Sequence, residues 1–307
     1  MNRKILLVIT GPTAVGKTDY AITLAQALHT EIISADSRQI YREMRIGTAR
    51  PSEEQLQRIP HHMVGCRSIH EYYNASLYEE EVIKLLETLF QQHDVVVLTG
   101  GSGLYIDAVC SGIDDLPTID PQVRQHFANR LKQEGLAVLQ EELRKIDPSY
   151  CQTADMANPK RVLKALEVYA MTHRPYSSFL KRTPKQRPFQ PVFVVLDLPR
   201  PELHQRINTR VDQMLLAGLI DEAKKLHPFK HLNALNTVGY KELFDYFEGK
   251  YELEQAIALI KRNTRRYARR QLTWFRKYQQ AIWLPPQSPE MLLQWLKTQR
   301  ITSSNNY

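Results

Sequence analysis

The sequence contains few cysteines and no long apolar segment. Only three of its 307 residues are cysteines, Cys66, Cys110 and Cys151. They are far apart in the chain and form no CxxC pair, so we expect reduced, structural thiols and no zinc site. No apolar run approaches the roughly 20 residues that a membrane-crossing helix needs. The apolar run in the opening segment MNRKILLVIT is too short for a signal peptide. These absences predict a cytoplasmic protein that has no membrane partner.

Acidic residues are nearly absent from the C-terminal region. Residues 261–307 contain one Asp or Glu against ten Lys and Arg, a net charge of +9, and residues 120–190 carry +6. Residues 1–119 and 191–260 carry −5 and −2, so the chain totals +8. Two basic segments beside an acidic half predict a large anionic partner, bound away from the acidic part.

Apolar runs of strand length alternate with segments of helical periodicity. The pattern predicts helices over Asp19–Leu28 and 75–93, and buried parallel strands over Lys4–Thr10, Glu31–Ala35, Asp94–Thr99 and Pro191–Leu198. Such alternation indicates an α/β fold with a parallel sheet, whose site lies at the carboxyl ends of the strands.

The alternation is interrupted in the middle of the chain. Residues 120–180 are helical in pattern, with breaks at prolines, and the proline-flanked segment 184–188 is typical of a connector. We therefore expect a helical insertion over residues 116–188. It divides an α/β core made of residues 1–115 and 189–307, and the end of that core is mostly helical.

One glycine-rich loop carries a specific phosphate-binding signal. GPTAVGKT fits GxxxxGK[ST] and lies between a predicted strand and a predicted helix, the context that this motif requires. Backbone N–H groups of such a loop surround a polyphosphate, the lysine contacts the terminal phosphate, and the final hydroxyl can bind Mg²⁺. The predicted phosphate ligands are Gly11, Pro12, Thr13, Ala14, Val15, Gly16, Lys17 and Thr18, with Thr18 as the metal ligand. The expected fold class is α/β, a P-loop NTPase-like sheet with a helical insertion domain.

The acid that a motor or switch NTPase would place at the end of a second strand is missing. The predicted strand Asp94–Thr99 is followed by Gly100 and Gly101, where such an acid would stand. Asp36 is the only acid at a strand exit beside the loop, and it could bind Mg²⁺, act as a general base, or cap a local turn. The second glycine loop, Gly100–Tyr105, is either a tight turn or another wall of the site.

Arginines and aromatic residues alternate near the C-terminus. Lys261–Gln280 contains eight basic residues and no acid, interleaved with Tyr267, Trp274, Phe275 and Tyr278. An all-basic helix with aromatic residues favours nucleic-acid phosphates over a solvated face, which normally mixes both signs. The predicted contacts are Arg265, Arg266, Arg269 and Arg270. Elsewhere, Lys160 and Arg161 are either phosphate contacts or surface charges, and Arg206 and Arg210 are either surface charges or cations on a leaving phosphate.

These motifs together resemble the tRNA dimethylallyltransferase (isopentenyltransferase) family of bacterial type. The resemblance covers nearly the whole chain and rests on six ordered motifs. They are GPTAVGKT (11–18), DSRQIYREMRIGTAR (36–50), PHHM (60–63), GGSGLY (100–105), NPKRVLKALEV (158–168) and RRYARRQLTW (265–274). Ser102 stands where Thr is usual and Arg50 where Lys is common, and the zinc-finger extension of eukaryotic relatives is absent.

The resemblance implies a prenyl transfer in which no phosphoryl group moves. Dimethylallyl diphosphate would be the donor, and the N6 amine of adenine 37 in the anticodon arm of tRNA the acceptor. Asp36 would take the amine proton, with Thr13 beside the reacting amine, while Lys17, Mg²⁺ and Arg210 stabilise the leaving diphosphate. The implied tRNA contacts are Asp36, Ser37, Arg38, Gln39, Ser102, Arg124, Pro159, Lys160, Arg161, Val162 and Leu163. We expect the enzyme to act as a monomer.

Two other activities remain compatible with parts of the sequence. A small-molecule kinase binding ATP would explain the glycine loop but neither basic segment. An adenylate isopentenyltransferase, acting on a free nucleotide, would have no need of the basic segment 261–280. Labelled dimethylallyl diphosphate offered with tRNA, AMP or ATP would distinguish these activities.

Overall fold

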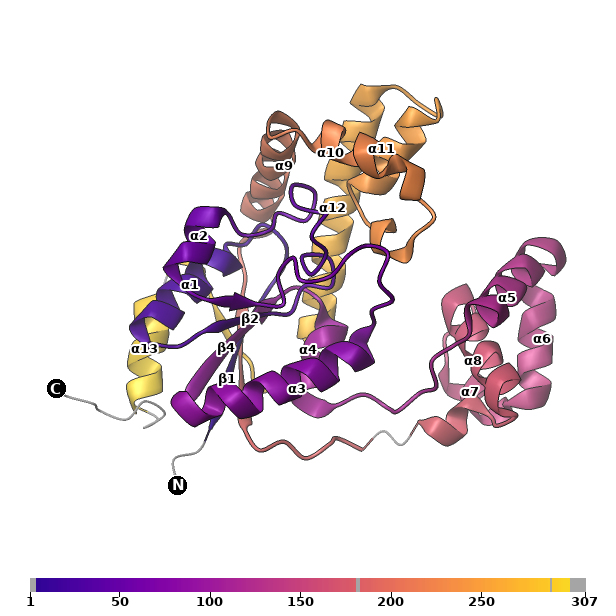
Figure 1. Cartoon of the computed structure of the whole chain (residues 1–307), viewed down its shortest axis with the longest axis horizontal. Coiled ribbons are helices and arrows are strands. Elements are labelled where there is room, and N and C mark those ends of the chain that lie inside the picture. Colours follow the sequence, from indigo (N-terminus) through magenta and orange to yellow (C-terminus); the bar gives the residue numbers. More distant parts are fainter. Residues whose placement is uncertain (1–3, 181–182, 288, 299–307) are drawn as a thin grey trace. The chain divides into compact units, whose positions relative to one another are not determined.

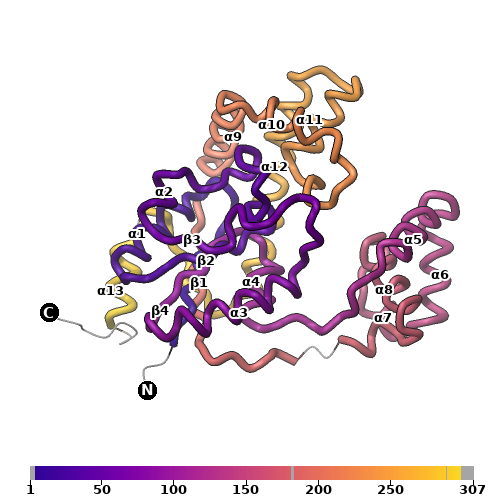
Figure 2. The backbone as a smooth tube through the Cα atoms, viewed as in Figure 1, coloured from indigo at the N-terminus to yellow at the C-terminus, as the bar shows by residue number. Residues whose placement is uncertain are grey.

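A computed structural model describes residues 4–180, 183–287 and 289–298. The chain divides into two compact units. The core unit contains the residues up to Ser111 together with those from Gln186 onward, and the insertion unit contains Gly112–Lys185. Figure 2 traces how the backbone leaves the core unit after α4 (Gly103–Ser111) and re-enters it before β5 (Gln190–Leu196).

The core unit is built on a parallel sheet of six strands in the order β3-β2-β4-β1-β5-β6. The strands are β1 (Ile5–Thr10), β2 (Ile32–Ser34), β3 (His61–His62), β4 (Val95–Gly100), β5 (Gln190–Leu196) and β6 (Ile282–Leu284). The predicted parallel α/β sheet is therefore confirmed. The two short edge strands, β3 and β6, were not predicted, because two or three residues carry no usable periodicity.

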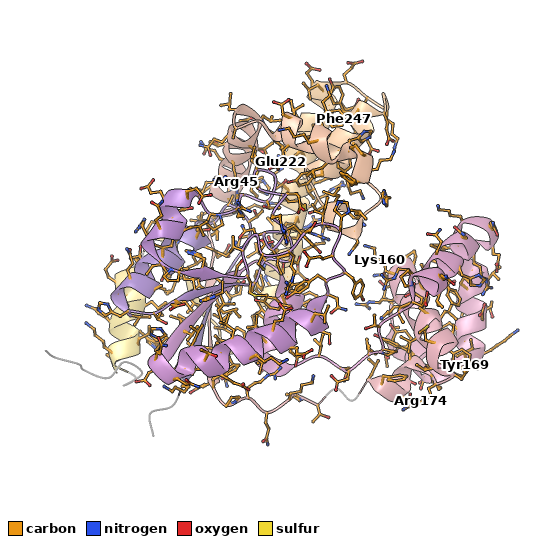
Figure 3. The ribbon with its side chains drawn as sticks, viewed as in Figure 1. Arg45, Lys160, Tyr169, Arg174, Glu222 and Phe247 are labelled. Carbon is orange, nitrogen blue, oxygen red and sulfur yellow. The ribbon has the colours of Figure 1, made fainter. Side chains whose placement is uncertain are left out.

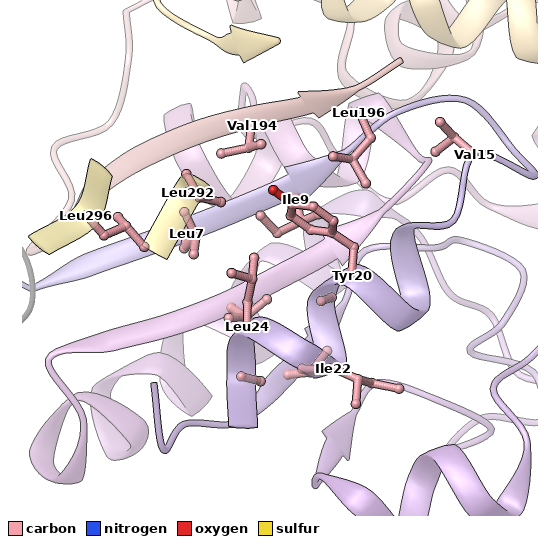
Figure 4. Packing of buried hydrophobic residues seen from close by; sticks show 14 of the residues in the cluster. Leu7, Ile9, Val15, Tyr20, Ile22, Leu24, Val194, Leu196, Leu292 and Leu296 are labelled. Atoms are coloured by element: carbon pink, nitrogen blue, oxygen red, sulfur yellow. The ribbon is translucent and has the colours of Figure 1, made fainter. Parts of the chain in front are cut away.

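Helices cover both faces of this sheet (Figure 1). On one face, α1 (Lys17–Ala27) and α13 (Pro289–Thr298) pack against alternate residues of β1 and β5. Figure 4 shows Leu7 and Ile9 of β1 in this cluster, between Leu24 of α1 and Leu292 of α13. Successive strand residues point to opposite faces, so the buried Leu6 and Val8 face the other layer.

The other layer contains α3 (Ala75–Gln92) and α4 (Gly103–Ser111). Tyr78 of α3 packs against Tyr105 of α4 with ring centroids 4.5 Å apart. Its hydroxyl donates a hydrogen bond of 2.8 Å to the Ser34 carbonyl at the end of β2. This contact ties the helical layer to the strand that leads directly into Asp36.

The remaining helices of the core unit lie near the carboxyl ends of the strands (Figure 1). They are α2 (Glu53–Arg58), α9 (Arg200–Leu216), α10 (Leu219–Leu226), η2 (His227–Phe229), η3 (Asn233–Leu235), α11 (Tyr240–Phe247) and α12 (Leu253–Phe275). In α12, the buried residues Ala256, Ile260 and Ala268 recur at helical spacing and face the protein. The arginines between these positions lie at the surface or line cavities.

The insertion unit is a small helical bundle with its own core. Its elements are α5 (Pro121–Glu134), α6 (Leu136–Ile146), α7 (Pro148–Thr153), α8 (Pro159–Thr172) and η1 (Tyr176–Phe179). Three of these helices begin with proline at the first position, which suits the fixed φ of that residue. Phe127, Leu139, Leu143 and Leu166 pack together in the interior.

No helix among the described residues is both long enough and apolar enough to cross a membrane.

Candidate active site

Two cavities adjoin at the carboxyl ends of the central strands. The P-loop cavity, of about 760 Å³, is lined by Gly16, Lys17 and Thr18, and the α12 cavity, of about 680 Å³, by Arg262 and Arg266. Five residues line both cavities: Thr13, Asp36, Thr48, Arg210 and Tyr267. We call these five residues the junction. The sequence-predicted catalytic residues Thr13, Asp36 and Arg210 are thus brought together there.

The glycine loop adopts the backbone geometry that its sequence predicts. Gly11 (φ 148°) and Gly16 (φ 104°) have positive φ angles. A Cβ at Gly11 would lie 2.4 Å from the carbonyl oxygen of Leu196 in β5, so only glycine fits there. The loop passes directly into α1 at Lys17, which aims the free N–H groups of the helix start at the P-loop cavity.

Lys17 is held inside the loop that precedes it. Its Nζ donates hydrogen bonds to the carbonyl oxygens of Gly11 (3.0 Å) and Pro12 (2.8 Å). Burial, and after it the nearby Arg210, lowers the pKa of Lys17 to about 7, against the opposing effect of Asp36. A diphosphate in this cavity would supply the negative charge that restores full protonation.

Arg210 and Arg206 approach the loop from α9. Arg210 Nη1 donates to Thr13 Oγ1 at 3.2 Å, and burial lowers the pKa of Arg210 from its usual value. Arg206 forms an ion pair with Glu202 at 2.9 Å, while its Nη1 lies 3.5 Å from the Val15 carbonyl oxygen. Arg210 is therefore the guanidinium at the junction, and Arg206 lines only the P-loop cavity.

The two carboxylate oxygens of Asp36 differ in their contacts. The amides of Arg38 and Gln39 donate to its Oδ1 at 2.9 and 3.3 Å, so the carboxylate does cap the local turn. Within the described residues, Oδ2 has no hydrogen-bond partner. Since Asp36 lines both cavities, that second oxygen can accept a proton from a group bound at the junction.

The residues that follow Asp36 use their side chains to hold neighbouring loops. Arg38 Nη1 donates to the carbonyls of Asn233 and Ala234, and Gln39 Nε2 donates to those of Thr48 and Ala49. The hydroxyl of Ser102, in the second glycine loop, accepts from the Ser37 amide at 2.9 Å. The predicted role of Ser37, Arg38, Gln39 and Ser102 in binding tRNA thus coexists with a visible role in shaping the site.

Glu222 of α10, which sequence analysis did not single out, anchors the loop that carries Thr48. Its carboxylate accepts hydrogen bonds from three successive amides, those of Arg45, Ile46 and Gly47, and from the hydroxyl of Tyr240 at 2.6 Å. Figure 3 shows Arg45 and Glu222 side by side. No local pattern reveals this role, because the partners are more than 170 residues apart in sequence.

The arginines of α12 are distributed over two sides of the helix. Arg262, Arg266 and Arg270 line the α12 cavity. A third cavity of about 470 Å³ is lined by Arg262, Arg265, Arg266 and Arg269 of α12, by Arg276 just after that helix, and by Arg200 and His204 of α9. Arg265 Nη1 also donates to Asn208 Oδ1 at 2.7 Å. The four predicted contacts therefore do not form one face: Arg270 borders the junction side, whereas Arg265 and Arg269 border the outer side.

Six of the predicted tRNA contacts lie in the insertion unit. Arg124 is on α5, and residues 159–163 form the start of α8. Lys160 and Arg161 are exposed. Val162 is fully buried in the core of the unit, so its side chain is not available to a nucleic acid. Only the backbone of Val162 could make the predicted tRNA contact.

No protein-only metal centre is visible in the part of the chain that the structure describes. There, no group of three or more His, Cys, Asp or Glu side chains is placed to hold a metal ion. This does not conflict with the predicted Thr18 ligand, since Mg²⁺ commonly takes one or two protein ligands and completes its shell with phosphate oxygens and water.

A family model and curated relatives match most of the chain. The model described as IPP transferase matches residues 39–278. The protein named tRNA dimethylallyltransferase 1 of Phocaeicola vulgatus is 50% identical over 291 residues, 95% of this chain and 97% of the relative. Its namesake in Bacteroides thetaiotaomicron is 48% identical over 297 residues, covering 97% and 96% of the two chains.

Solved structures agree in fold over the same extent. The full-length tRNA isopentenylpyrophosphate transferase of Bacillus halodurans is 35% identical with a TM-score of 0.69, covering 97% of this chain and 96% of that one. A eukaryotic dimethylallyltransferase described as acting on tRNA is 27% identical with a TM-score of 0.76, covering 97% of this chain and 77% of that one.

Proposed function

Since this chain belongs to the IPP transferase family, as a relative of the bacterial tRNA dimethylallyltransferases, we propose how its two cavities divide the work of prenyl transfer. The enzyme transfers the dimethylallyl group of dimethylallyl diphosphate to N6 of adenine 37 in tRNA. The P-loop cavity takes the donor and the α12 cavity takes the acceptor base. The observation that carries this division is the junction, where Asp36, Thr13 and Arg210 line both cavities.

The bond changes at the junction are simple to balance. The N6 nitrogen attacks C1 of the dimethylallyl group, the C1–oxygen bond breaks, and diphosphate leaves with the electron pair. Asp36 Oδ2 accepts one N6 proton, because its Oδ1 is already engaged by two amides. Lys17, Arg210 and the loop amides offset the charge that develops on the leaving diphosphate.

An adenine within a stacked anticodon loop cannot reach the half-buried carboxylate of Asp36, so the base must be turned out of the stack. The α12 cavity suits such a base, because it combines Arg262, Arg266 and Arg270 with the aromatic Tyr267 at the junction. Burial and then Asp36 raise the pKa of Tyr267, so its phenol is neutral beside the base.

Mg²⁺ fits the donor end of the site. The Thr18 hydroxyl lines the P-loop cavity and has no hydrogen-bond partner among the described residues, so it is available as a ligand beside diphosphate oxygens. When bound there, the ion would supply additional positive charge to the leaving group.

The test of this function is a comparison of acceptors. Purified enzyme is incubated with labelled dimethylallyl diphosphate and Mg²⁺, together with unmodified tRNA, AMP or ATP. We expect label only in tRNA, at adenine 37, located by nuclease digestion. Label in AMP or ATP would identify a nucleotide prenyltransferase, and tRNA-independent phosphate transfer from ATP would identify a kinase.

The two sides of α12 allow the RNA contacts to be tested separately. Substituting glutamine in the pair Arg266 and Arg270 or in the pair Arg265 and Arg269 should weaken tRNA binding and flatten the slope of log Kd against log salt. The expected change in slope is roughly 0.7–0.9 for each RNA phosphate that the variant no longer neutralises. Affinity for dimethylallyl diphosphate should stay unchanged.

A control with the same loss of charge comes from α10, where Lys224 and Lys225 are exposed. Replacing both with glutamine should leave the salt slope at its wild-type value. Equal slopes for wild type and an α12 pair would remove that side of the helix from the RNA interface.

A further inference from the structure

Gln271 occupies a buried position between the two glycine loops. It lies on α12 and is only 5% exposed. Its Oε1 accepts a hydrogen bond of 2.9 Å from the Thr13 amide, and its Nε2 donates one of 2.9 Å to the Gly101 carbonyl. An uncharged amide side chain suits this position, because its oxygen accepts from one loop while its nitrogen donates to the other.

The second glycine loop is shaped to admit this side chain. A Cβ at Gly101 would lie 2.2 Å from Gln271 Nε2, and a Cβ at Gly103 would lie 2.3 Å from the Trp274 ring. Gln271 and Trp274 are one helical turn apart, so α12 meets the loop along one line of contact. The helix therefore rests directly on the backbone of both loops.

Thr13 is consequently held from two helices. Gln271 of α12 binds its backbone amide, and Arg210 of α9 binds its hydroxyl at 3.2 Å. Thr13 lines both cavities, whereas the two polar atoms of the Gln271 amide are already occupied by backbone groups. Gln271 also lines the P-loop cavity, but it reaches the junction only through Thr13, because its amide is already bonded to the two loops.

We propose that Gln271 is a positioning residue that sets Thr13, and with it the mouth of the phosphate loop, relative to the helix that binds the acceptor. The inference rests on the proposed function, because that function places Thr13 beside the reacting N6 amine and the diphosphate. Its physical basis is that small displacements of a reacting group cost large factors in rate, whereas binding through remote contacts persists.

The test is a double-mutant cycle on the single-turnover rate with both substrates saturating. Gln271→Met retains the length and apolar stem but makes neither hydrogen bond, and it should lower the rate about 10–100-fold. The Kd for tRNA should change less than about 2-fold. Thr273→Val is the control, because Thr273 is on the same helix and its hydroxyl bonds only to the Arg269 carbonyl.

The second arm of the cycle isolates the route through Thr13. In a Thr13→Ala background, Gln271→Met should cost less than about 2-fold, because the hydroxyl that it positions is gone. A full additional loss in that background would overturn the proposal. So would a Gln271→Met enzyme that turns over at the wild-type rate.

Gln271→Glu covers the case in which the methionine variant does not fold. Glutamate still accepts from the Thr13 amide but cannot donate to Gly101, and its charge opposes the diphosphate. We expect the kcat of Gln271→Glu to lie closer to the wild-type value than the kcat of Gln271→Met does. If the methionine variant is unfolded, the reference is the background rate instead. The KM for the donor should be raised. A kcat as low as that of the methionine variant, or as background, contradicts the proposal. If wild type itself transfers no label to tRNA, the proposed function fails instead.

Discussion

Asp36→Asn should lower the rate of prenyl transfer by about 10²–10⁴-fold, the range expected for the loss of a general base. Asparagine retains an oxygen that can accept from the amides of Arg38 and Gln39, so the local turn survives. It cannot take a proton from N6. The measurement is the single-turnover rate at saturating tRNA and donor, together with the Kd for tRNA, which should stay within a few fold of wild type.

Asp36→Ala separates the base from the cap. Alanine removes both roles, so its rate should be no higher than that of Asp36→Asn. Its thermal stability should be lower, because the amides of Arg38 and Gln39 no longer have a side-chain acceptor. If Asp36→Asn turns over normally while Asp36→Ala does not, the carboxylate serves only as a cap, and another group must accept the proton.

Lys17→Met should lower kcat by about 10²–10³-fold, as expected when one charged donor to a developing anion is removed. The Lys17 ammonium donates to the carbonyls of Gly11 and Pro12, within the loop that we propose surrounds the diphosphate. Folding should be retained, because methionine preserves the apolar stem without a buried charge. Hydrolysis of ATP stimulated by tRNA and matching turnover would contradict this role and indicate an NTPase.

The pH dependence of donor binding gives an independent test of Lys17. Its pKa is about 7 in the free site, and a bound diphosphate raises that pKa, so binding takes up a proton when Lys17 is neutral beforehand. Affinity should therefore be full below pH 7 and fall as pH rises above it, by up to tenfold per pH unit.

The measurement compares the Kd of dimethylallyl diphosphate for wild type and Lys17→Met between pH 6 and 9. The titration of the ligand itself is common to both proteins and cancels in the comparison. The difference in log Kd between them should shrink as pH rises. A difference that is constant over this range would show that Lys17 does not titrate in the free enzyme.

The main features of the fold followed from local patterns in the sequence. Four of the six strands and the helices 75–93 and 19–28 were predicted within a few residues, because apolar runs and helical periodicity depend only on neighbours in the chain. The glycine loop was equally visible, since its residues are consecutive and its function needs only a strand before it and a helix after it.

Tertiary structure decided how distant segments complete the site. The family resemblance implied separate roles for Asp36 and Arg210, and only the tertiary structure places both at one junction. Glu222 had no sequence signal, because its contacts join a helix to a loop more than 170 positions away in the chain. The arginines of α12 were visible as a basic segment, but the packing of the helix places Arg270 in one cavity and Arg265 and Arg269 in another, while Arg262 and Arg266 line both.

The sequence by itself therefore determined the chemistry available: a phosphate-binding loop, the acid Asp36 just after a strand, and a basic helix. Only the tertiary structure decided which of these groups meet, because a contact such as that between Gln271 and Thr13 spans 258 positions. Hydrogen bonds of that kind depend on the docking of whole helices, which no local pattern of residues encodes.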